Sequence, residues 1–204
     1  MIKQPNFESK SNLSADETAD IGILSSLPPE ELSSLLDTIE VQVEPLSQRQ
    51  RQISAKIPIF QAIEPIWQVL TDYEALADFI PNLSKSQLLE HPTGGIRLEQ
   101  IGTQRLLRFN FSARVVLDLE EKFPNEISFN LVEGDLKAFS GSWRLQPDTH
   151  SKQVTTNLFY TVSILPKLTM PVSIIERRLS NDLRLNLLAI RQRVSNLIGT
   201  IANG

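Results

Sequence analysis

The sequence contains no cysteine, only two histidines and only eight glycines among its 204 residues. The absence of cysteine excludes disulfides, thiolate nucleophiles and cysteine-ligated zinc. The few glycines leave little material for a phosphate-binding loop, and neither a nucleophile elbow nor an H-x-x-x-H pair is present. We expect His91 and His150 to be exposed to solvent, because each lies in a predicted turn. The sequence therefore offers no motif for catalysis or metal binding, and we expect no cofactor.

Long apolar runs and an excess of positive charge are also missing. No stretch of 18 or more apolar residues exists, so we expect no transmembrane helix, and the first 20 residues lack the apolar core of a secretory signal. The net charge of −4 and the pI near 5.3 argue against nucleic-acid binding. We expect a cytoplasmic protein whose contact with membranes is at most peripheral.

Apolar residues make up 41% of the chain, which is enough for one packed domain. The first 20 residues are rich in Ser, Asn, Asp and Glu, a composition typical of disorder. Prolines, acidic residues and spaced leucines then predict a short helix near residues 29–38, either docked on the domain or on a partner, or loosely packed. We therefore divide the chain into a disordered or loosely ordered tail, residues 1–38, and a domain, residues 39–204.

From residue 40 the apolar residues recur with a period of two, which predicts β-strands. The first strand extends from Val41 to Ile59 and is bent or broken near Pro45. A hairpin follows, and the clearest strand pattern then runs from Leu107 to Leu119, with apolar residues at every second position. Three further turns separate the remaining strands, and no βαβ pattern is present. The sequence therefore predicts a curved antiparallel sheet of about six or seven strands.

Two helical regions accompany these strands. Residues 63–81 predict a pair of short helices that ends at Pro81. After a hinge at residues 166–171, apolar residues recur every three or four positions from Ile175 to Ile201, which predicts a long final helix. Its other face is basic and carries Arg177, Arg178, Arg184, Arg191 and Arg193. These arginines either are solvated and pair with acidic residues at the sheet edge, or contact anionic lipid headgroups.

An extended run, a helix pair with a W-x-V-L-x-D-Y core and a Phe-Ile-Pro end, many strands and a long last helix follow one another over residues 40–198. This order resembles the START-like superfamily, also called the SRPBCC or polyketide cyclase/dehydrase group, which includes lipid carriers, coenzyme Q-binding proteins, hormone receptors and a few cyclases. The resemblance implies an α+β helix-grip fold, in which a curved antiparallel sheet wraps around the long C-terminal helix and a short helix pair follows the first strand.

A single helix cannot fill the concave side of such a sheet, so bulky side chains or a ligand must occupy the gap. In the START-like family this gap is the ligand cavity, covered by the last helix and gated by the helix pair, and the resemblance implies the same here. Opening would require the helix pair, or the loop at residues 168–171, to swing away from the sheet. We expect the cavity to be lined by mostly aromatic or flexible apolar side chains: Trp67, Leu70, Tyr73, Phe79, Ile80, Phe139, Trp143, Tyr160, Met170 and Ile175. Phe109, Phe111 and Phe129 are weaker candidates, because mid-strand side chains often pack directly onto the helix.

These observations favour binding over catalysis. The expected ligand is a hydrophobic small molecule, a lipid or an isoprenoid quinone, bound by a carrier, chaperone or sensor. One alternative is a polyketide cyclase/dehydrase-type enzyme, which needs an ionisable side chain pointing into the cavity. The alternation places Arg108, Arg114 and Arg144 on the opposite face, where they cannot reach a substrate. A second alternative is an assembly factor that docks on a membrane complex through the basic helix or residues 29–38.

Overall fold

The computed structural model describes residues 28–106, 109–168 and 171–202. Its strands form a single antiparallel sheet in the order β1-β2-β8-β7-β6-β5-β4-β3. The strands are β1 (Val41–Pro45), β2 (Arg51–Ile59), β3 (Leu83–Leu89), β4 (Ile96–Leu106), β5 (Phe109–Lys122), β6 (Glu126–Gly134), β7 (Ala138–Pro147) and β8 (Thr156–Leu165). The helices are α1 (Pro29–Asp37), α2 (Ile63–Thr71), the 3-10 helix η2 (Glu74–Asp78) and α3 (Val172–Ala202).

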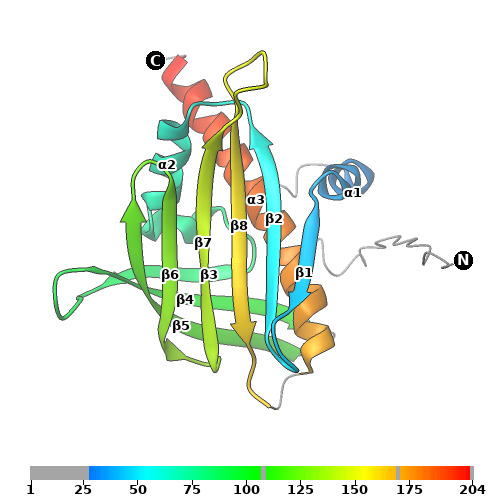
Figure 1. Cartoon of the computed structure of the whole chain (residues 1–204), viewed down its shortest axis with the longest axis vertical. Coiled ribbons are helices and arrows are strands. Elements are labelled where there is room, and N and C mark those ends of the chain that lie inside the picture. Colours follow the sequence, from blue (N-terminus) through cyan, green and yellow to red (C-terminus); the bar gives the residue numbers. More distant parts are fainter. Residues whose placement is uncertain (1–27, 107–108, 169–170, 203–204) are drawn as a thin grey trace, which may run out of the picture.

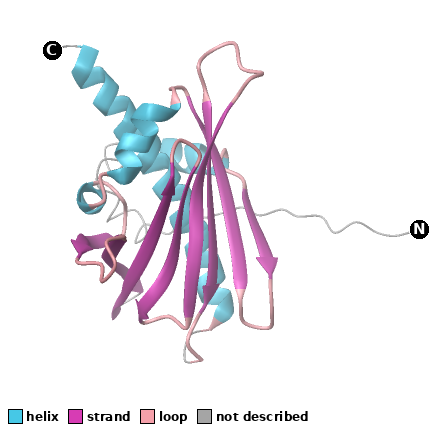
Figure 2. Cartoon of the chain, turned by 60° about the vertical axis from the view of Figure 1, so that its left-hand side comes forward, coloured by secondary structure: helices cyan, strands magenta, loops and turns pink. Residues whose placement is uncertain are grey.

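The sheet is strongly curved, because β3, β4 and β5 run across the direction of β6, β7 and β8 (Figure 1). The long helix α3 crosses one face of the sheet, and α2 lies beside its C-terminal half (Figures 1 and 2). β2 pairs with β8 although about a hundred residues separate them in the sequence. This is the predicted helix-grip arrangement, so the expected fold class is confirmed.

The core lies between the sheet and α3. Every second residue of β8, from Thr156 to Ile164, is buried, and the same alternation holds for β2 from Ile53 to Ile59. The predicted apolar stripe of α3 supplies the other side of the core through Leu183, Leu187, Ile190 and Val194, all at most 1% exposed. Apolar side chains that recur at periods of 2 and 3.6 therefore meet in one layer.

The predicted first strand is in fact two strands. Residues 46–50 form a turn after Pro45, and Val41 of β1 pairs with Ala55 of β2 in an antiparallel hairpin. Proline is tolerated here because it ends an edge strand, where its missing N–H breaks no ladder. This extra hairpin explains why the sheet has eight strands rather than six or seven.

α1 is packed tightly against the domain, whereas loose packing was one of the alternatives expected for residues 29–38. Leu32, Leu36 and Ile39 are at most 3% exposed and belong to the main core. The Arg184 side chain on α3 donates a hydrogen bond from Nε to the Ile39 carbonyl at 3.1 Å. The predicted disorder of the first 20 residues lies outside the described residues, and a domain boundary at residue 38 stays a prediction.

Several arginines on the basic face of α3 contact other parts of the protein. Arg184 binds the Ile39 carbonyl, and Arg193 stacks over the Phe79 ring at 5.5 Å. Arg191 is half-buried, and this burial lowers the pKa of its guanidinium. Exposed positive charge on α3 therefore concentrates near its start, at Arg177. Among the described helices, none has the length and hydrophobicity needed to cross a membrane.

Candidate functional site

Four aromatic side chains meet on the concave face of the sheet, and we call them the inner aromatic cluster: Phe129 of β6, Phe139 and Trp143 of β7, and Tyr160 of β8. The Trp143 and Tyr160 rings are stacked, with centroids 5.2 Å apart and planes 24° apart. The Phe129 ring contacts Phe139 at 5.4 Å and Trp143 at 5.6 Å. Such ring contacts contribute stability in addition to the free energy gained from burial of their apolar area.

Strand pairing explains why these rings meet. Trp143 lies directly opposite Tyr160 across the β7–β8 ladder, so both side chains stand on the same face. Phe129 lies opposite Gly141 on the β6–β7 ladder. Because glycine has no side chain there, the Phe129 ring lies over the backbone of β7; a Cβ at Gly141 would approach the ring to 2.6 Å. The missing side chain at residue 141 therefore brings Phe129 into contact with both aromatic residues of β7.

Exposure of the concave face changes along its length. On β7, Leu145 is 1% exposed, whereas Trp143 and Phe139 are only partly buried although they point to the same side. On β6, Ile127 is fully buried and Leu131 is partly buried. On α3, Leu179 near the start is partly buried, while the apolar side chains from residue 183 onward are buried. The concave face is thus closed near α2 and accessible to solvent toward the start of α3.

Polar groups lie among these apolar side chains. Trp143 Nε1 and Asn186 Oδ1 are buried and have no hydrogen-bond partner within the described part of the chain. Burial and the nearby carboxylate of Asp182 raise the pKa of Tyr160 well above its usual range, so its phenol stays protonated at neutral pH. Asp182 accepts a hydrogen bond from Asn82 Nδ2 at 3.1 Å. The site therefore combines an aromatic surface with a few polar groups.

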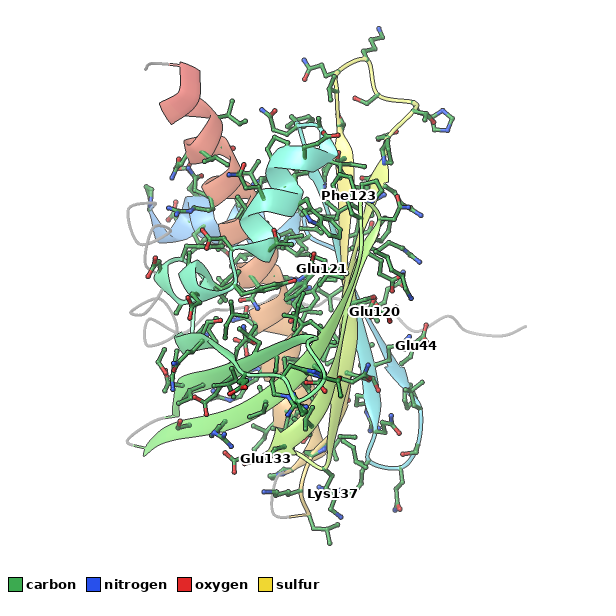
Figure 3. The ribbon with its side chains drawn as sticks, turned by 90° about the vertical axis from the view of Figure 1, so that its left-hand side faces the viewer. Glu44, Glu120, Glu121, Phe123, Glu133 and Lys137 are labelled. Atoms are coloured by element: carbon green, nitrogen blue, oxygen red, sulfur yellow. The ribbon has the colours of Figure 1, made fainter. Side chains whose placement is uncertain are left out.

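The segment from α2 to the start of β3 is held at several points. The Trp67 ring meets the edge of Phe123 at 5.2 Å, and the Tyr73 hydroxyl donates to Glu121 Oε1 at 2.6 Å. Figure 3 shows Phe123 and Glu121 at the end of β5 that faces α2. Burial and the hydrogen bond to Glu121 both raise the pKa of Tyr73, so this donor keeps its proton. Ser86 of β3 adds a bond to the Tyr73 carbonyl at 2.6 Å.

Most of the predicted cavity residues lie in two separate regions of the structure. Phe139, Trp143 and Tyr160 come together in the inner aromatic cluster, and Phe129, a weaker candidate, lies at its centre. The α2–η2 region holds Trp67, Leu70, Tyr73, Phe79 and Ile80, of which all but Ile80 are buried. Ile175 is partly buried in the first turn of α3. Met170 and the side chains of Phe109 and Phe111 lie outside the described residues.

Sequence reasoning missed Gly141, Asp182 and Asn186. An isolated glycine within a strand pattern does signal a close approach, so Gly141 was detectable. The two polar residues of α3 were not, because their inward direction depends on how the helix is rotated against the sheet.

The convex face carries ion pairs rather than site residues. Arg114 pairs with Glu99 at 2.5 Å and with Glu133 at 2.6 Å, and Arg144 lies over the Phe159 ring at 5.0 Å, so both point away from the inner aromatic cluster as predicted. Arg108 lies outside the described residues. Within the described chain, no group of three or more His, Asp or Glu side chains is placed to hold a metal.

The prediction that His91 is solvent-exposed is wrong. Its side chain is 14% exposed, because Nδ1 accepts hydrogen bonds from the backbone N–H groups of Thr93 and Gly95, and Nε2 faces Asp118 at 3.3 Å. The β3–β4 turn is folded around this ring. His91 therefore supports a turn on the convex face and does not belong to the concave site.

Many solved structures match this fold, and the three described below are at most 18% identical to this chain. A START superfamily protein from Mycobacterium smegmatis is 18% identical, with a TM-score of 0.60 over 72% of this chain and 98% of its own. The Zhui aromatase/cyclase from Streptomyces is 16% identical, with a TM-score of 0.60 over 73% of this chain and 96% of its own. A STAR-related lipid transfer protein from Xanthomonas axonopodis is 16% identical, with a TM-score of 0.60 over 77% of this chain and 93% of its own.

At these identities the structures establish the fold and nothing more. A search of curated proteins finds no significant match. The family model described as polyketide cyclase / dehydrase and lipid transport matches residues 62–188, which is more than half of the chain and runs from the start of α2 into α3. The chain therefore belongs to the polyketide cyclase/dehydrase and lipid transport family, with a START-like fold.

Proposed function

We propose that this protein binds a neutral hydrophobic small molecule, a lipid or an isoprenoid quinone, against the inner aromatic cluster. One observation carries the proposal: Phe139 and Trp143 point to the concave face yet stay partly exposed, while Leu145 of the same strand is buried. Phenylalanine and tryptophan side chains in folded proteins are on average highly buried. The family description and the lipid transfer protein among the similar structures support this choice of ligand.

Desolvation supplies enough free energy for such binding. Each buried CH₂ group contributes roughly 0.8 kcal/mol, so a chain with about twelve buried groups gains about 10 kcal/mol before the cost of lost freedom. No proton transfer or metal is needed. A carrier or sensor can therefore work with this aromatic surface alone.

The gradient of exposure suggests where the ligand enters. Side chains on β6, β7 and α3 become more exposed toward the start of α3, whereas the opposite end is closed beneath α2. We therefore place the entrance near the start of α3, rather than at the helix pair of residues 63–81 that the resemblance suggested as a gate.

An enzyme of the cyclase/dehydrase type is the weaker interpretation. Tyr160 and Asp182 do place ionisable groups on the concave side. General acid–base catalysis works best when the pKa of the group lies near the working pH. Burial raises the pKa of Tyr160 away from that range, so its phenol can donate a hydrogen bond but cannot act as a base. These groups suit orientation of a ligand better than turnover.

The entrance end also has the composition of a membrane-contact surface. Leu46, Leu168 and Ile174 are each at least 41% exposed there. Arg49 of the β1–β2 turn donates to the Lys167 carbonyl at 3.0 Å, which joins the turn to the β8–α3 connection, and Arg177 is exposed nearby on α3. We propose that this end rests on an anionic lipid surface during ligand exchange. Flotation with lipid vesicles measures this contact.

Energy transfer from tryptophan tests ligand binding. The chain has two tryptophans, so the Trp67→Phe variant leaves Trp143 as the only donor. Diphenylhexatriene, a neutral apolar fluorophore that absorbs where tryptophan emits, should quench Trp143 saturably in delipidated protein. Phe139→Ser in this background should weaken binding by about tenfold, because a contacting ring is lost.

Phe60→Ser is the matched control, because Phe60 is 61% exposed in the β2–α2 connection and lies outside the cluster. It should leave the affinity unchanged. Absence of saturable quenching would contradict binding at the inner aromatic cluster. Equal losses of affinity in Phe139→Ser and Phe60→Ser would contradict it as well.

A further inference from the structure

Two polar atoms inside the proposed site have no hydrogen-bond partner among the described residues: Trp143 Nε1 and Asn186 Oδ1. A buried polar atom without a partner is costly, and the great majority of such atoms in folded proteins are paired. Neither atom contributes a hydrogen bond to the described part of the fold. Their presence therefore points to a group that joins them when the site is loaded.

A chain of contacts places both atoms in one region. Trp143 stacks on Tyr160 with ring centroids 5.2 Å apart. The Tyr160 phenol lies within the electrostatic reach of Asp182 on α3. Asn186 follows Asp182 by four residues, so it lies one helical turn away on the same face of α3. These links connect Trp143 of β7, through Tyr160 and Asp182, to the face of α3 that carries Asn186.

The two atoms have complementary hydrogen-bonding chemistry. An indole N–H can only donate, and an amide carbonyl oxygen can only accept. A single hydroxyl group can accept from the first and donate to the second. We infer that the ligand of this site is a neutral hydroxylated apolar molecule, whose hydroxyl accepts a hydrogen bond from Trp143 Nε1 and donates one to Asn186 Oδ1. This inference rests on the proposed binding function and specifies its ligand.

Other ligand classes fit these groups less well. A quinone carbonyl can only accept, so it would satisfy Trp143 and leave the Asn186 oxygen unpaired. A carboxylate can accept from Trp143 but cannot donate to the Asn186 oxygen, and the negative charge of Asp182 in the same region would repel it. A phenol, a hydroquinone or a long-chain alcohol satisfies both atoms. The site should therefore prefer a hydroquinone to the corresponding quinone.

A pair of ligands that differ in one hydrogen-bond donor tests the inference. Displacement of diphenylhexatriene from the wild-type protein gives the affinities of 4-dodecylphenol and of its methyl ether, 4-dodecylanisole. We expect the phenol to bind about tenfold more tightly, because the ether leaves the Asn186 oxygen unpaired. The Asn186→Leu variant should reduce this preference to about twofold or less, because it removes the acceptor that only the phenol can use. Trp143→Phe removes a donor from which both oxygens can accept, so it should weaken both ligands and leave the preference near tenfold.

Phe139→Leu is the matched control, since it removes ring area without touching a polar atom. It should weaken both ligands together and leave their ratio unchanged. In the ligand-free state, Asn186→Leu should raise Tm by about 3 °C, because it removes a buried unpaired oxygen.

Each outcome has a distinct meaning. Equal affinities of phenol and ether for the wild-type protein would show that solvent satisfies both atoms and would overturn the inference, while the proposed binding function would stand. A preference that survives in Asn186→Leu would also overturn it. If neither compound displaces the fluorophore and the fluorophore itself does not bind, the proposed function fails.

Discussion

Gly141 shows how one residue without a side chain can shape a binding surface. It lies in the middle of β7 opposite Phe129, between the two aromatic residues of that strand that belong to the inner aromatic cluster. A Cβ at this position would lie 2.2 Å from the Thr161 carbonyl oxygen and 2.6 Å from the Phe129 ring. Real Cβ atoms do not approach backbone this closely, so the strand or the ring would have to move.

We therefore expect Gly141→Ala to lower the free energy of unfolding by about 2 kcal/mol, a typical cost of overpacking. Urea denaturation followed by circular dichroism measures this change. Gly199→Ala is the control, because a Cβ at Gly199 on α3 meets nothing within 4 Å. Alanine is the better helix former, so this variant should be more stable by roughly 0.5–1 kcal/mol. A Gly141→Ala variant as stable as wild type would contradict the close approach of Phe129.

Alternation along the strands was sufficient to predict which face Phe139, Trp143 and Tyr160 occupy, because a period of two fixes side-chain direction. It did not predict that Phe129 would lie at the centre of the cluster, since that depends on pairing between strands. Asn186 could not be predicted at all as a site residue. The rotation of a helix is set by its whole apolar stripe, and a polar residue at the edge of the stripe can face either way.

At the scale of elements, the α2–η2 segment is better anchored than a mobile gate needs. Tyr73 bonds to Glu121 of β5 and accepts from Ser86 of β3, and Phe79 packs beneath Arg193 of α3. Asn82, whose φ of 62° is unusual for a residue other than glycine, ties the end of the segment to Asp182. The segment therefore closes one end of the domain.

Loss of one of these bonds should loosen the segment without opening the site. We expect Tyr73→Phe to speed hydrogen exchange of amides in α2 and η2 by about fivefold, the equivalent of one hydrogen bond of about 1 kcal/mol. Release of diphenylhexatriene should change by less than about twofold, because we propose that the ligand enters at the other end. Exchange is measured by mass spectrometry and release by stopped-flow fluorescence.

Glu121→Gln keeps a carbonyl acceptor for the Tyr73 hydroxyl, so its effect on exchange should be smaller. Ligand release that accelerates in step with hydrogen exchange would restore the helix pair as the gate and contradict an entrance near the start of α3.

The helices and most strands could be predicted from periodicity, since each element repeats its own pattern. The β1–β2 hairpin could not, because Pro45 was interpreted as a break within one strand. The pairing of β2 with β8 also has no local signature. It follows from closure of the sheet around α3, which brings distant segments together.

At the scale of the whole molecule, the two ends of the sheet differ in chemistry. The end near α2 exposes Phe60 and Phe123. The opposite end, where Figure 3 shows Glu133 and Lys137, carries Lys167 and the start of α3. Lys167, whose ammonium lies 3.8 Å from Asp135, and Arg177 bring exposed positive charge to this end, and Arg49 joins the β1–β2 turn to it.

Charge reversal at this end should weaken vesicle binding. The double variant Lys167→Glu, Arg177→Glu changes two exposed basic residues. Each substitution should weaken the attraction to anionic lipid by about 1 kcal/mol, or about fivefold in affinity. Flotation with vesicles that contain phosphatidylserine measures the change. Lys152→Glu, an exposed lysine in the β7–β8 connection at the other end, is the control and should bind as wild type does. Equal losses of vesicle binding in the double variant and in Lys152→Glu would contradict contact through this one end of the domain.

The central claim is that the concave face holds a neutral apolar ligand, and identification of what the protein carries tests this claim most directly. Freshly purified wild-type protein, the Phe139→Ser variant and the Phe60→Ser variant are each extracted with organic solvent. The three extracts are then compared by mass spectrometry. We predict a stoichiometric hydroxylated apolar compound in the wild-type and Phe60→Ser samples, and its depletion in Phe139→Ser. Absence of any bound compound, together with failure of delipidated protein to take up lipids, quinones or hydroquinones, would contradict the claim.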